Sequence, residues 1–393
     1  MKFNKFKKVA LPINIVLFNL CRLNPFRSKK IWVFGGWEGA HYDDNSRHLF
    51  EYVNRKYPDI LAIWLTKSSE IANQIQSDGF SAYTFYSIKG VWAALRAGVA
   101  IYSHGLIDFG LFPLVGGAKI VSLWHGMGFK KIYNAKYNGL KLKVKKMLSH
   151  FFSWTWRDIT TVTSEYTRTQ FQHIFGIDPK DVFITGQPRN DALFKCRSKS
   201  VVLESLKIND DKKIILYMPT YRAPSLGCDY MKGLVDELFD SPMLDNFLER
   251  ENAVFLVKLH PLTPHMVFPK RENFRILDYN SVKNNQELLS VSDILVTDYS
   301  SCFVDFALLN RPIIFYVPDQ DKFVSQSEGL DADFFRISKL NSARDVEEFV
   351  FKLEHSSNVV CAATNELFED PSIRGTCYCR NVYKLIASKI ADG

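Results

Sequence analysis

Short apolar runs alternate with amphipathic segments along the chain from Lys30 onward. Short apolar runs bounded by polar or turn residues predict buried strands, and apolar positions three and four apart predict helices. On this pattern, strands are expected at residues 31–34, 61–66, 99–102 and 119–123, and helices at residues 45–57 and 87–97. The first helix has Asn45 or Ser46 near its N-cap. Strands that alternate with helices are typical of a parallel sheet covered by helices.

The alternation stops at residues 130–157, where lysines are mixed with Phe, Trp, Leu and Met, and a strand is expected again at residues 160–163. A polar, charged stretch at residues 196–213 predicts the link between two domains. A second alternating series follows at residues 214–317, and a final helix is expected at residues 376–390. The chain therefore contains two separate series of alternating elements.

We predict an α/β fold with two Rossmann-like, doubly wound domains that face each other across a cleft. The expected parts are an N-terminal basic and apolar segment at residues 1–29, a first domain at residues 30–200, and a second domain at residues 201–393 that includes the closing helix. With 393 residues, of which 47% are hydrophobic, the chain is large enough to bury two cores.

Charge and cysteine content narrow the possible partners and the compartment. Fifty Lys and Arg against 42 Asp and Glu give a net charge of +8, which favours an anionic partner such as a nucleotide, a lipid headgroup or a nucleic acid. The seven cysteines are scattered and odd in number, so neither a disulfide framework nor a zinc site is expected. A reducing compartment fits this composition best.

The N-terminal segment superficially resembles a signal peptide, because four lysines precede the apolar residues 9–21. Pro12, Asn14 and Asn19 interrupt this stretch, which is shorter than the roughly 20 residues that a membrane span requires. Arg22 follows without a small-residue cleavage site. We interpret the segment as a cytoplasmic one that either packs on the protein or lies on a membrane.

The most informative motif is Asp298-Tyr299-Ser300-Ser301, which directly follows the apolar residues 294–296. Ser300 and Ser301 are expected to open a helix, and a helix N-terminus at a strand's carboxyl end suits a phosphate. Asp305 lies one turn further along and could accept hydroxyl groups of a ribose or a polyol. This motif predicts part of a nucleotide site.

Further polar motifs follow apolar runs, and each also has a structural interpretation. His125, in Trp124-His125-Gly126, could remove a proton from a hydroxyl nucleophile, or could be a hydrogen-bonded loop residue. Gly186 to Asp191 could carry polar ligands, or could cap a helix at Asn190 or Asp191. In Pro219-Thr220-Tyr221-Arg222, Arg222 could bind a pyrophosphate or form a surface salt bridge. In Lys258-Leu259-His260-Pro261, Lys258 and His260 are expected on one side of a strand and Leu259 on the other.

Taken in order, these segments resemble the CDP-glycerol glycerophosphotransferase family, the teichoic-acid and related capsule enzymes. The matching segments are Trp124-His125-Gly126 with Lys130-Lys131, Gly186–Asp191 with Phe194, Leu216–Arg222, Lys258–Pro261, and Asp293–Ser301 with Asp305. The resemblance covers residues 120–320, and the ordered set is more specific than any one segment.

The resemblance implies a GT-B-like fold and peripheral attachment to the cytoplasmic face of the cell membrane. It implies transfer of a polyol phosphate from a CDP-polyol to a hydroxyl of a lipid-linked glycan acceptor, with release of CMP. The expected catalytic residues are His125, as general base, and His260. The expected donor-binding residues are Gly126, Met127, Gly128, Phe129, Arg189, Pro219, Thr220, Arg222, Lys258, Leu259, Asp298, Ser300, Ser301 and Asp305. No metal or cofactor is expected besides the substrate, CDP-glycerol or CDP-ribitol.

One segment departs from the family. Where the family commonly has His-Gly-Thr-Pro-Leu, this chain has His125-Gly126-Met127-Gly128-Phe129, so a hydroxyl and a rigid proline are lost. This difference leaves the choice among glycerol, ribitol and another polyol open. The acceptor, the oligomeric state and the number of units added stay open too, although the short chain favours a primase or a short-chain transferase over a large processive polymerase.

Residues 130–157 are expected to dock on a membrane, since lysines can bind anionic headgroups while aromatic rings enter the interface. The residues proposed for this contact are Lys141, Lys143, Lys145, Lys146, Phe151, Phe152, Trp154 and Trp156. A solvated helix followed by core aromatics is the alternative. Two other functions are considered: a GT-B glycosyltransferase that uses a nucleotide sugar, and a basic nucleic-acid-binding protein, for which no binding motif is present.

Overall fold

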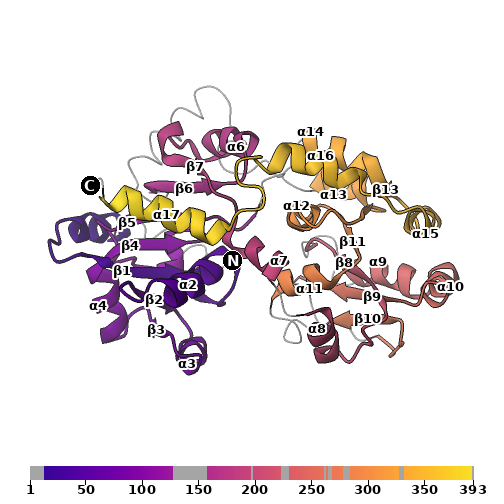
Figure 1. Cartoon of the computed structure of the whole chain (residues 1–393), viewed down its shortest axis with the longest axis horizontal. Helices are drawn as coiled ribbons and strands as arrows, with labels where there is room; N and C mark the ends of the chain where they lie inside the picture. Colours follow the sequence, from indigo (N-terminus) through magenta and orange to yellow (C-terminus); the bar gives the residue numbers. More distant parts are fainter. Residues whose placement is uncertain are drawn as a thin grey trace. The chain divides into compact units, whose positions relative to one another are not determined.

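The computed structural model describes residues 13–126, 157–195, 198–222, 230–260, 263, 268–277, 284–326 and 332–391. These residues form two compact units (Figure 1). The first unit contains the described residues up to His125, those from Arg157 to Asp191, and those from Glu369 onward. The second unit contains Gly126 and the described residues from Ala192 to Phe368.

The first unit is built on a seven-stranded parallel sheet with the order β3-β2-β1-β4-β5-β6-β7. Its strands are β1 (Ser28–Gly35), β2 (Leu61–Thr66), β3 (Ser81–Thr84), β4 (Ala97–Tyr102), β5 (Lys119–Ser122), β6 (Ile159–Val162) and β7 (Val182–Ile184). Its helices are α2 (Asp44–Lys56), α3 (Ser69–Ser77), α4 (Ile88–Arg96), α6 (Glu165–Phe175) and α17 (Tyr378–Ala391), with short 3-10 turns η1 (Trp37–Gly39), η2 (Leu106–Phe109), η4 (Pro179–Asp181) and η5 (Pro188–Asn190). The predicted strands and helices of this half are confirmed, with small shifts at their ends.

Both faces of this sheet are buried, which explains why its strands are continuous apolar runs. Trp32 and Phe34 of β1 lie in one core cluster, whereas Val33 lies in a second cluster on the other face. The residues 13–22 are helical and pack on the second cluster through Phe18, whose side chain is 2% exposed. No helix in the described ranges is long and apolar enough to span a membrane.

The closing helix belongs to the first unit, so the predicted domain boundaries were wrong at this point. Val382 and Ile386 of α17 share a core cluster with Trp32, and Figure 1 shows the yellow helix lying along the first sheet. The carboxylate of Asp191 accepts hydrogen bonds from the backbone N–H groups of Tyr378 (2.8 Å) and Cys379 (3.0 Å) at the start of α17. The first unit ends at Asp191 rather than at residue 200 before the chain enters the second unit.

The second unit has a six-stranded parallel sheet with the order β10-β9-β8-β11-β12-β13. Its strands are β8 (Lys213–Met218), β9 (Ala253–Lys258), β10 (Phe274–Leu277), β11 (Ile294–Thr297), β12 (Ile313–Tyr316) and β13 (Ser342–Ala343). The helices after Asp191 are α7 (Asp191–Lys195), α8 (Lys199–Ser205), α9 (Tyr230–Phe239), α10 (Pro242–Arg250), α11 (Asn285–Val291), α12 (Cys302–Ala307), α13 (Gln320–Gln326), α14 (Ala332–Ser338), α15 (Val346–Glu354) and α16 (Val359–Phe368), with η7 (Lys339–Asn341) between α14 and β13. The prediction of two parallel-sheet α/β domains is confirmed.

Candidate active site

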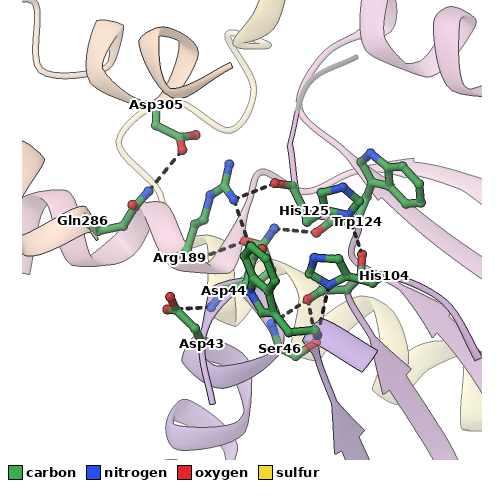
Figure 2. Close-up of polar contacts among 12 residues, drawn as sticks. Asp43, Asp44, Ser46, His104, Trp124, His125, Arg189, Gln286 and Asp305 are labelled. Carbon is green, nitrogen blue, oxygen red and sulfur yellow. Dashed lines mark hydrogen bonds and ion pairs between the residues drawn. The ribbon is translucent and has the colours of Figure 1, made fainter. Parts of the chain in front are cut away.

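The candidate site of the first unit lies where the strand order reverses. β1 and β4 are neighbours, and the sheet continues from β1 to β2 on one side and from β4 to β5 on the other. Open α/β sheets bind ligands at the carboxyl ends of strands at such a switch point. Trp37 follows β1, His104 follows β4 and His125 follows β5. Figure 2 shows that His104 and His125 meet there.

His125 has the tautomer that a general base needs. Its Nδ1 lies 3.1 Å from the carbonyl oxygen of Ser103. Because a carbonyl oxygen can only accept, Nδ1 carries the hydrogen and Nε2 carries the lone pair. Burial lowers the pKa of His125, although the Asp44 carboxylate acts in the opposite direction. A neutral imidazole with a lone pair on Nε2 can take a proton from a hydroxyl group.

His104 lies directly against this base and has the opposite tautomer. The two imidazole rings are parallel, with 4.1 Å between centroids and an interplanar angle of 1°. The backbone N–H of Trp37 donates to Nδ1 of His104 at 3.1 Å, so the hydrogen of His104 is on Nε2. Burial lowers the pKa of His104 to about 3, and this ring is therefore uncharged at neutral pH.

The loop that carries His125 is held by Arg189 and Asn45. The Arg189 Nη1 donates to the carbonyl oxygen of His125 and to Oδ1 of Asp44, each at 2.9 Å. The Asn45 amide donates to the carbonyl oxygen of Trp124 at 2.8 Å and accepts from the backbone N–H of Arg189 at 3.1 Å. Figure 2 shows these contacts around Asp44. Arg189 therefore holds the loop, and its expected contact with the donor stays a prediction.

A fully buried carboxyl group joins two of the strand exits. Oδ2 of Asp108 accepts from the backbone N–H groups of Ser103 (3.1 Å) and His104 (2.8 Å). Its Oδ1 accepts from the backbone N–H of Glu38 at 2.7 Å. Burial raises the pKa of Asp108 to about 7, against the effect of these N–H donors. The segments after β1 and β4 are thus fixed to one side chain.

Backbone strain is concentrated at the same edge of the sheet. Trp37 and Glu38 have φ of 51°, Asp44 has 69° and Trp124 has 55°. These are four of the seven non-glycine residues with positive φ in the described part of the chain. Such residues are uncommon and cluster at functional sites. Their grouping around the two histidines supports a functional role for this edge.

In the second unit, Arg222 and Asp298 form a buried network. Arg222 donates through Nη2 to Asp298 (2.8 Å), through Nε to Asp319 (2.8 Å) and through Nη1 to the carbonyl oxygen of Thr220 (2.7 Å). Asp298 also accepts from the backbone N–H groups of Thr220 (2.8 Å) and Tyr299 (2.5 Å). The side chains of Arg222 and Asp298 are 2% and 0% exposed. These contacts fix the two strand ends, and the expected contact of Arg222 and Asp298 with the donor stays a prediction.

The motif at Ser300 and Ser301 does open a helix, as predicted. Helix α12 begins at Cys302 with Ser301 as N-cap, and Ser300 Oγ accepts from the backbone N–H of Cys302 at 3.4 Å. Asp305 is buried, and Nε2 of Gln286 donates to its Oδ2 at 3.2 Å (Figure 2). The contacts of these residues with a donor stay predictions.

Lys258, Leu259 and His260 are only partly arranged as expected. Lys258 is buried at the end of β9, and Leu259 packs against the core of the second unit. The prediction that Lys258 and His260 share one face of a strand is wrong, because β9 ends at Lys258. The ring of His260 lies beyond the strand, 5.7 Å from that of Tyr221 between centroids.

Pro219 and Thr220 lie just after β8, where a ligand was expected. Pro219 is buried, and the buried Oγ1 atom of Thr220 has no hydrogen-bond partner among the residues that the structure describes. An unpartnered buried hydroxyl is costly unless a ligand or water satisfies it. This observation favours a polar ligand at the end of β8.

Several expected residues lie outside the described residues. They are Met127, Gly128 and Phe129 of the donor set, and the docking residues Lys141, Lys143, Lys145, Lys146, Phe151, Phe152, Trp154 and Trp156. Gly126 is described and buried. Within the described ranges, no group of three or more His, Cys, Asp or Glu side chains is arranged to hold a metal ion.

The sequence interpretation missed His104, Asp44, Asn45 and Asp108. A signal for His104 was present, because His104-Gly105 follows one predicted strand just as His125-Gly126 follows the next. The parallel pairing of Tyr102 with Ser122 brings these exits together. Asn45 was considered only as a residue near a helix N-cap and Asp44 was not singled out, because nothing in the local pattern indicated their contacts with Arg189 and the loop of His125.

Comparisons with known sequences identify the family of this chain. A model of the CDP-glycerol:poly(glycerophosphate) glycerophosphotransferase family matches residues 16–365. A teichoic acid poly(glycerol phosphate) polymerase of Bacillus spizizenii is 29% identical and covers 90% of this chain and 90% of its own. A teichoic acid glycerol-phosphate transferase of Staphylococcus aureus is 28% identical over 84% of both chains. The chain spans about half of some longer relatives, including 46% of a Bacillus subtilis poly(glycerol phosphate) polymerase.

Solved structures show the same fold. A variant of the wall teichoic acid polymerase TagF superposes with a TM-score of 0.75 at 22% identity, covering 100% of this chain and 99% of its own. A TagF variant soaked with CDPG has a TM-score of 0.72 at 23% identity. A UDP-GlcNAc 2-epimerase of Neisseria meningitidis superposes with a TM-score of 0.53 at 11% identity, over 92% of this chain and 99% of its own. The GT-B-like fold class is thereby confirmed.

Proposed function

Because the chain belongs to the CDP-glycerol:poly(glycerophosphate) glycerophosphotransferase family, we propose that it transfers a polyol phosphate, glycerol phosphate first, from a CDP-polyol. The acceptor is a hydroxyl group of a lipid-linked glycan, and CMP is released. The product belongs to a teichoic-acid or capsule-type polymer. Relatives that are named as glycerol-phosphate transferases and polymerases support this proposal.

The observation that carries the proposal is the neutral His125 with its lone pair on Nε2. The acceptor hydroxyl attacks the phosphorus that bears the polyol, and its proton passes to Nε2 of His125. A new O–P bond forms while the bond to the bridging oxygen of CMP breaks, and CMP leaves with that electron pair. Each turnover thus consumes one hydroxyl and one CDP-polyol and leaves a phosphodiester.

The second unit supplies groups for the donor. The Oγ1 of Thr220, which is buried and has no partner in the described part of the chain, and the hydroxyls of Ser300 and Ser301 are suited to the pyrophosphate, together with Lys258 and His260. Asp305, held by Gln286, accepts hydroxyl groups of the ribose or the polyol. Charge stabilisation of this kind is the main requirement of phosphoryl transfer.

The donor and the length of the product need direct measurement. A teichoic acid poly(ribitol-phosphate) polymerase of Bacillus spizizenii is 28% identical over 83% of this chain, so ribitol competes with glycerol. Chain length does not separate a primase from a polymerase, because a polymerase of comparable length matches 90% of both chains.

The test is CMP release from CDP-glycerol and CDP-ribitol, side by side, with membrane extract as acceptor and His125→Ala as control. Release that depends on one donor and on His125 supports the proposal and names the polyol. Release from a UDP-sugar with neither CDP-polyol active would favour the nucleotide-sugar glycosyltransferase instead. His260→Ala, assayed alongside, tests the second expected catalytic histidine.

The membrane contact that a lipid-linked acceptor requires is best supported at the helix of residues 13–22. Val16 and Leu20 on this helix and Leu23 in the turn after it are each more than half exposed, whereas Phe18 on the other face of the helix is buried. Eight of the 50 Lys and Arg precede Glu38, the first acidic residue, and the other 42 equal the 42 Asp and Glu of the whole chain. The net charge of +8 therefore comes from residues 1–37, and a basic segment of this kind suits an anionic lipid surface.

Cosedimentation with vesicles tests this contact. We expect binding to phosphatidylcholine vesicles that contain phosphatidylglycerol, and at least about tenfold weaker binding for the variant V16S/L20S/L23S. The matched control is M243S/F351S/V359S, which removes similarly exposed apolar side chains from the second unit. Equal binding of both variants and the wild type would remove this helix from the membrane contact.

A further inference from the structure

The parallel contact between His104 and His125 points to a role for His104 that rests on the proposed function. We infer that His104 is a positioning residue for His125: its stacked ring fixes the plane in which His125 presents Nε2. His104 acts through His125 in this proposal and does not touch the reacting atoms.

Two aromatic rings contact the ring of His125. The His104 ring stacks on it with 4.1 Å between centroids, and the Trp124 ring lies 4.4 Å from it between centroids at an angle of 34°. Nδ1 of His125 is directed at the carbonyl oxygen of Ser103. Any rotation of this ring would break the stack and the hydrogen bond together. A base that is fixed in this way keeps its lone pair in one direction, which proton transfer requires.

His104 is itself anchored, so it can serve as a rigid support. The backbone N–H of Trp37 fixes its Nδ1, and the Trp37 ring contacts it at 4.7 Å between centroids. Its backbone N–H donates to Asp108 at 2.8 Å. Ser103, the acceptor for His125, donates its own N–H to the same carboxyl group. The support and the hydrogen-bond acceptor of His125 therefore move as one piece.

The charge state of His104 affects whether His125 can be protonated. Asp44 and Arg189 both face His125, but their charges offset one another through a 2.9 Å ion pair. A cation at His104 would lie within the stack, where repulsion would oppose protonation of His125. Burial keeps His104 uncharged. His125 is then the imidazole of the pair that takes up and releases the proton.

Two measurements on the full-length enzyme test this inference. The first is the NMR titration of the His125 ring in the wild type and in His104→Ala and His104→Phe. The second is the pH profile of CMP release. Water that enters the space left in His104→Ala should raise the pKa of His125 toward its ordinary value, which moves the acid limb of kcat/KM to higher pH. His104→Phe keeps a stacking ring and should rescue most of this change.

We expect His104→Ala to lower kcat by roughly 10- to 100-fold, with KM for the CDP-polyol within about twofold of the wild type. The matched control is His355→Ala, because His355 is exposed and stacks on Phe351 at 4.2 Å, remote from the base in the sequence. Thermal unfolding of His104→Phe checks that the fold is kept.

An unchanged His125 titration in His104→Ala would overturn the inference, whether or not activity falls. A fall in kcat with an unchanged titration would mean that His104 acts on the substrate or on the fold. If no CDP-polyol releases CMP but the titration still shifts, the proposed function fails while the coupling of the two histidines stands.

Discussion

Arg222 is a buried residue whose contacts indicate a structural role. Arg222 was expected to bind a phosphate, yet its guanidinium is shared between Asp298 and Asp319. Coulombic attraction to these carboxylates raises the pKa of Arg222 well above its ordinary value, against the effect of burial. The paired Arg222 therefore stabilises the strand ends that carry the hydroxyl groups of Thr220 and Ser300.

Replacing Arg222 by Met should therefore lower the free energy of unfolding of the second unit. Removal of one partner from a buried ion pair typically costs about 3–5 kcal/mol, because the remaining charges stay buried. Urea unfolding checks this value. The control is Arg168→Met, which breaks the exposed Arg168–Glu165 pair (3.0 Å) and should cost less than about 1 kcal/mol. Equal costs for both variants would contradict the assignment.

His48 gives a prediction for the dependence of stability on pH. Burial, followed by the charge of Arg47, lowers its pKa to about 4, from about 6.5 in the unfolded chain. Between these values the unfolded chain binds a proton that the folded protein does not, so stability falls as pH decreases. His48→Gln should therefore gain up to about 2 kcal/mol relative to the wild type between pH 7.5 and 4.5. Urea unfolding at several pH values measures this, and a difference that does not change with pH would contradict it.

At the scale of secondary structure elements, the hydrophobic pattern was sufficient for most strands and helices. Residues 31–34 and 61–66 were predictable because buried parallel strands are continuous apolar runs. The site was predictable where a polar motif directly follows such a strand, as at His125. The pattern could not assign α17 to a sheet, because the apolar face of a helix does not specify its partner. It also could not show that Arg222 is paired, since both carboxylates lie more than 70 residues away.

The position of α17 predicts which unit depends on it. A chain that ends at Phe368 lacks Val382 and Ile386, so the core around Trp32 is opened and β1 should lose protection. Hydrogen exchange should show faster exchange in β1 and β2, while β8 and β9 keep their protection. Loss of protection in the second sheet instead would return α17 to the second domain.

At the scale of the whole molecule, the second unit is an insertion into the first. The chain leaves the first unit at Asp191 and returns to it at Glu369. We expect a fragment of residues 192–368 to fold alone, because it contains all six strands of its sheet and the core around Tyr217 and Phe255. Circular dichroism and a cooperative urea transition check this. A fragment without such a transition would show that the first unit is needed for its stability.

The short segment from Arg189 to Asp191 contacts two parts of the first unit that lie far apart in the sequence. Arg189 holds the carbonyl oxygen of His125, and Asp191 holds the first turn of α17. A disturbance at the C-terminal helix is therefore two residues away from the support of the base. Cargo fused behind α17, or proteolytic trimming of that helix, should therefore reduce turnover more than it weakens donor binding.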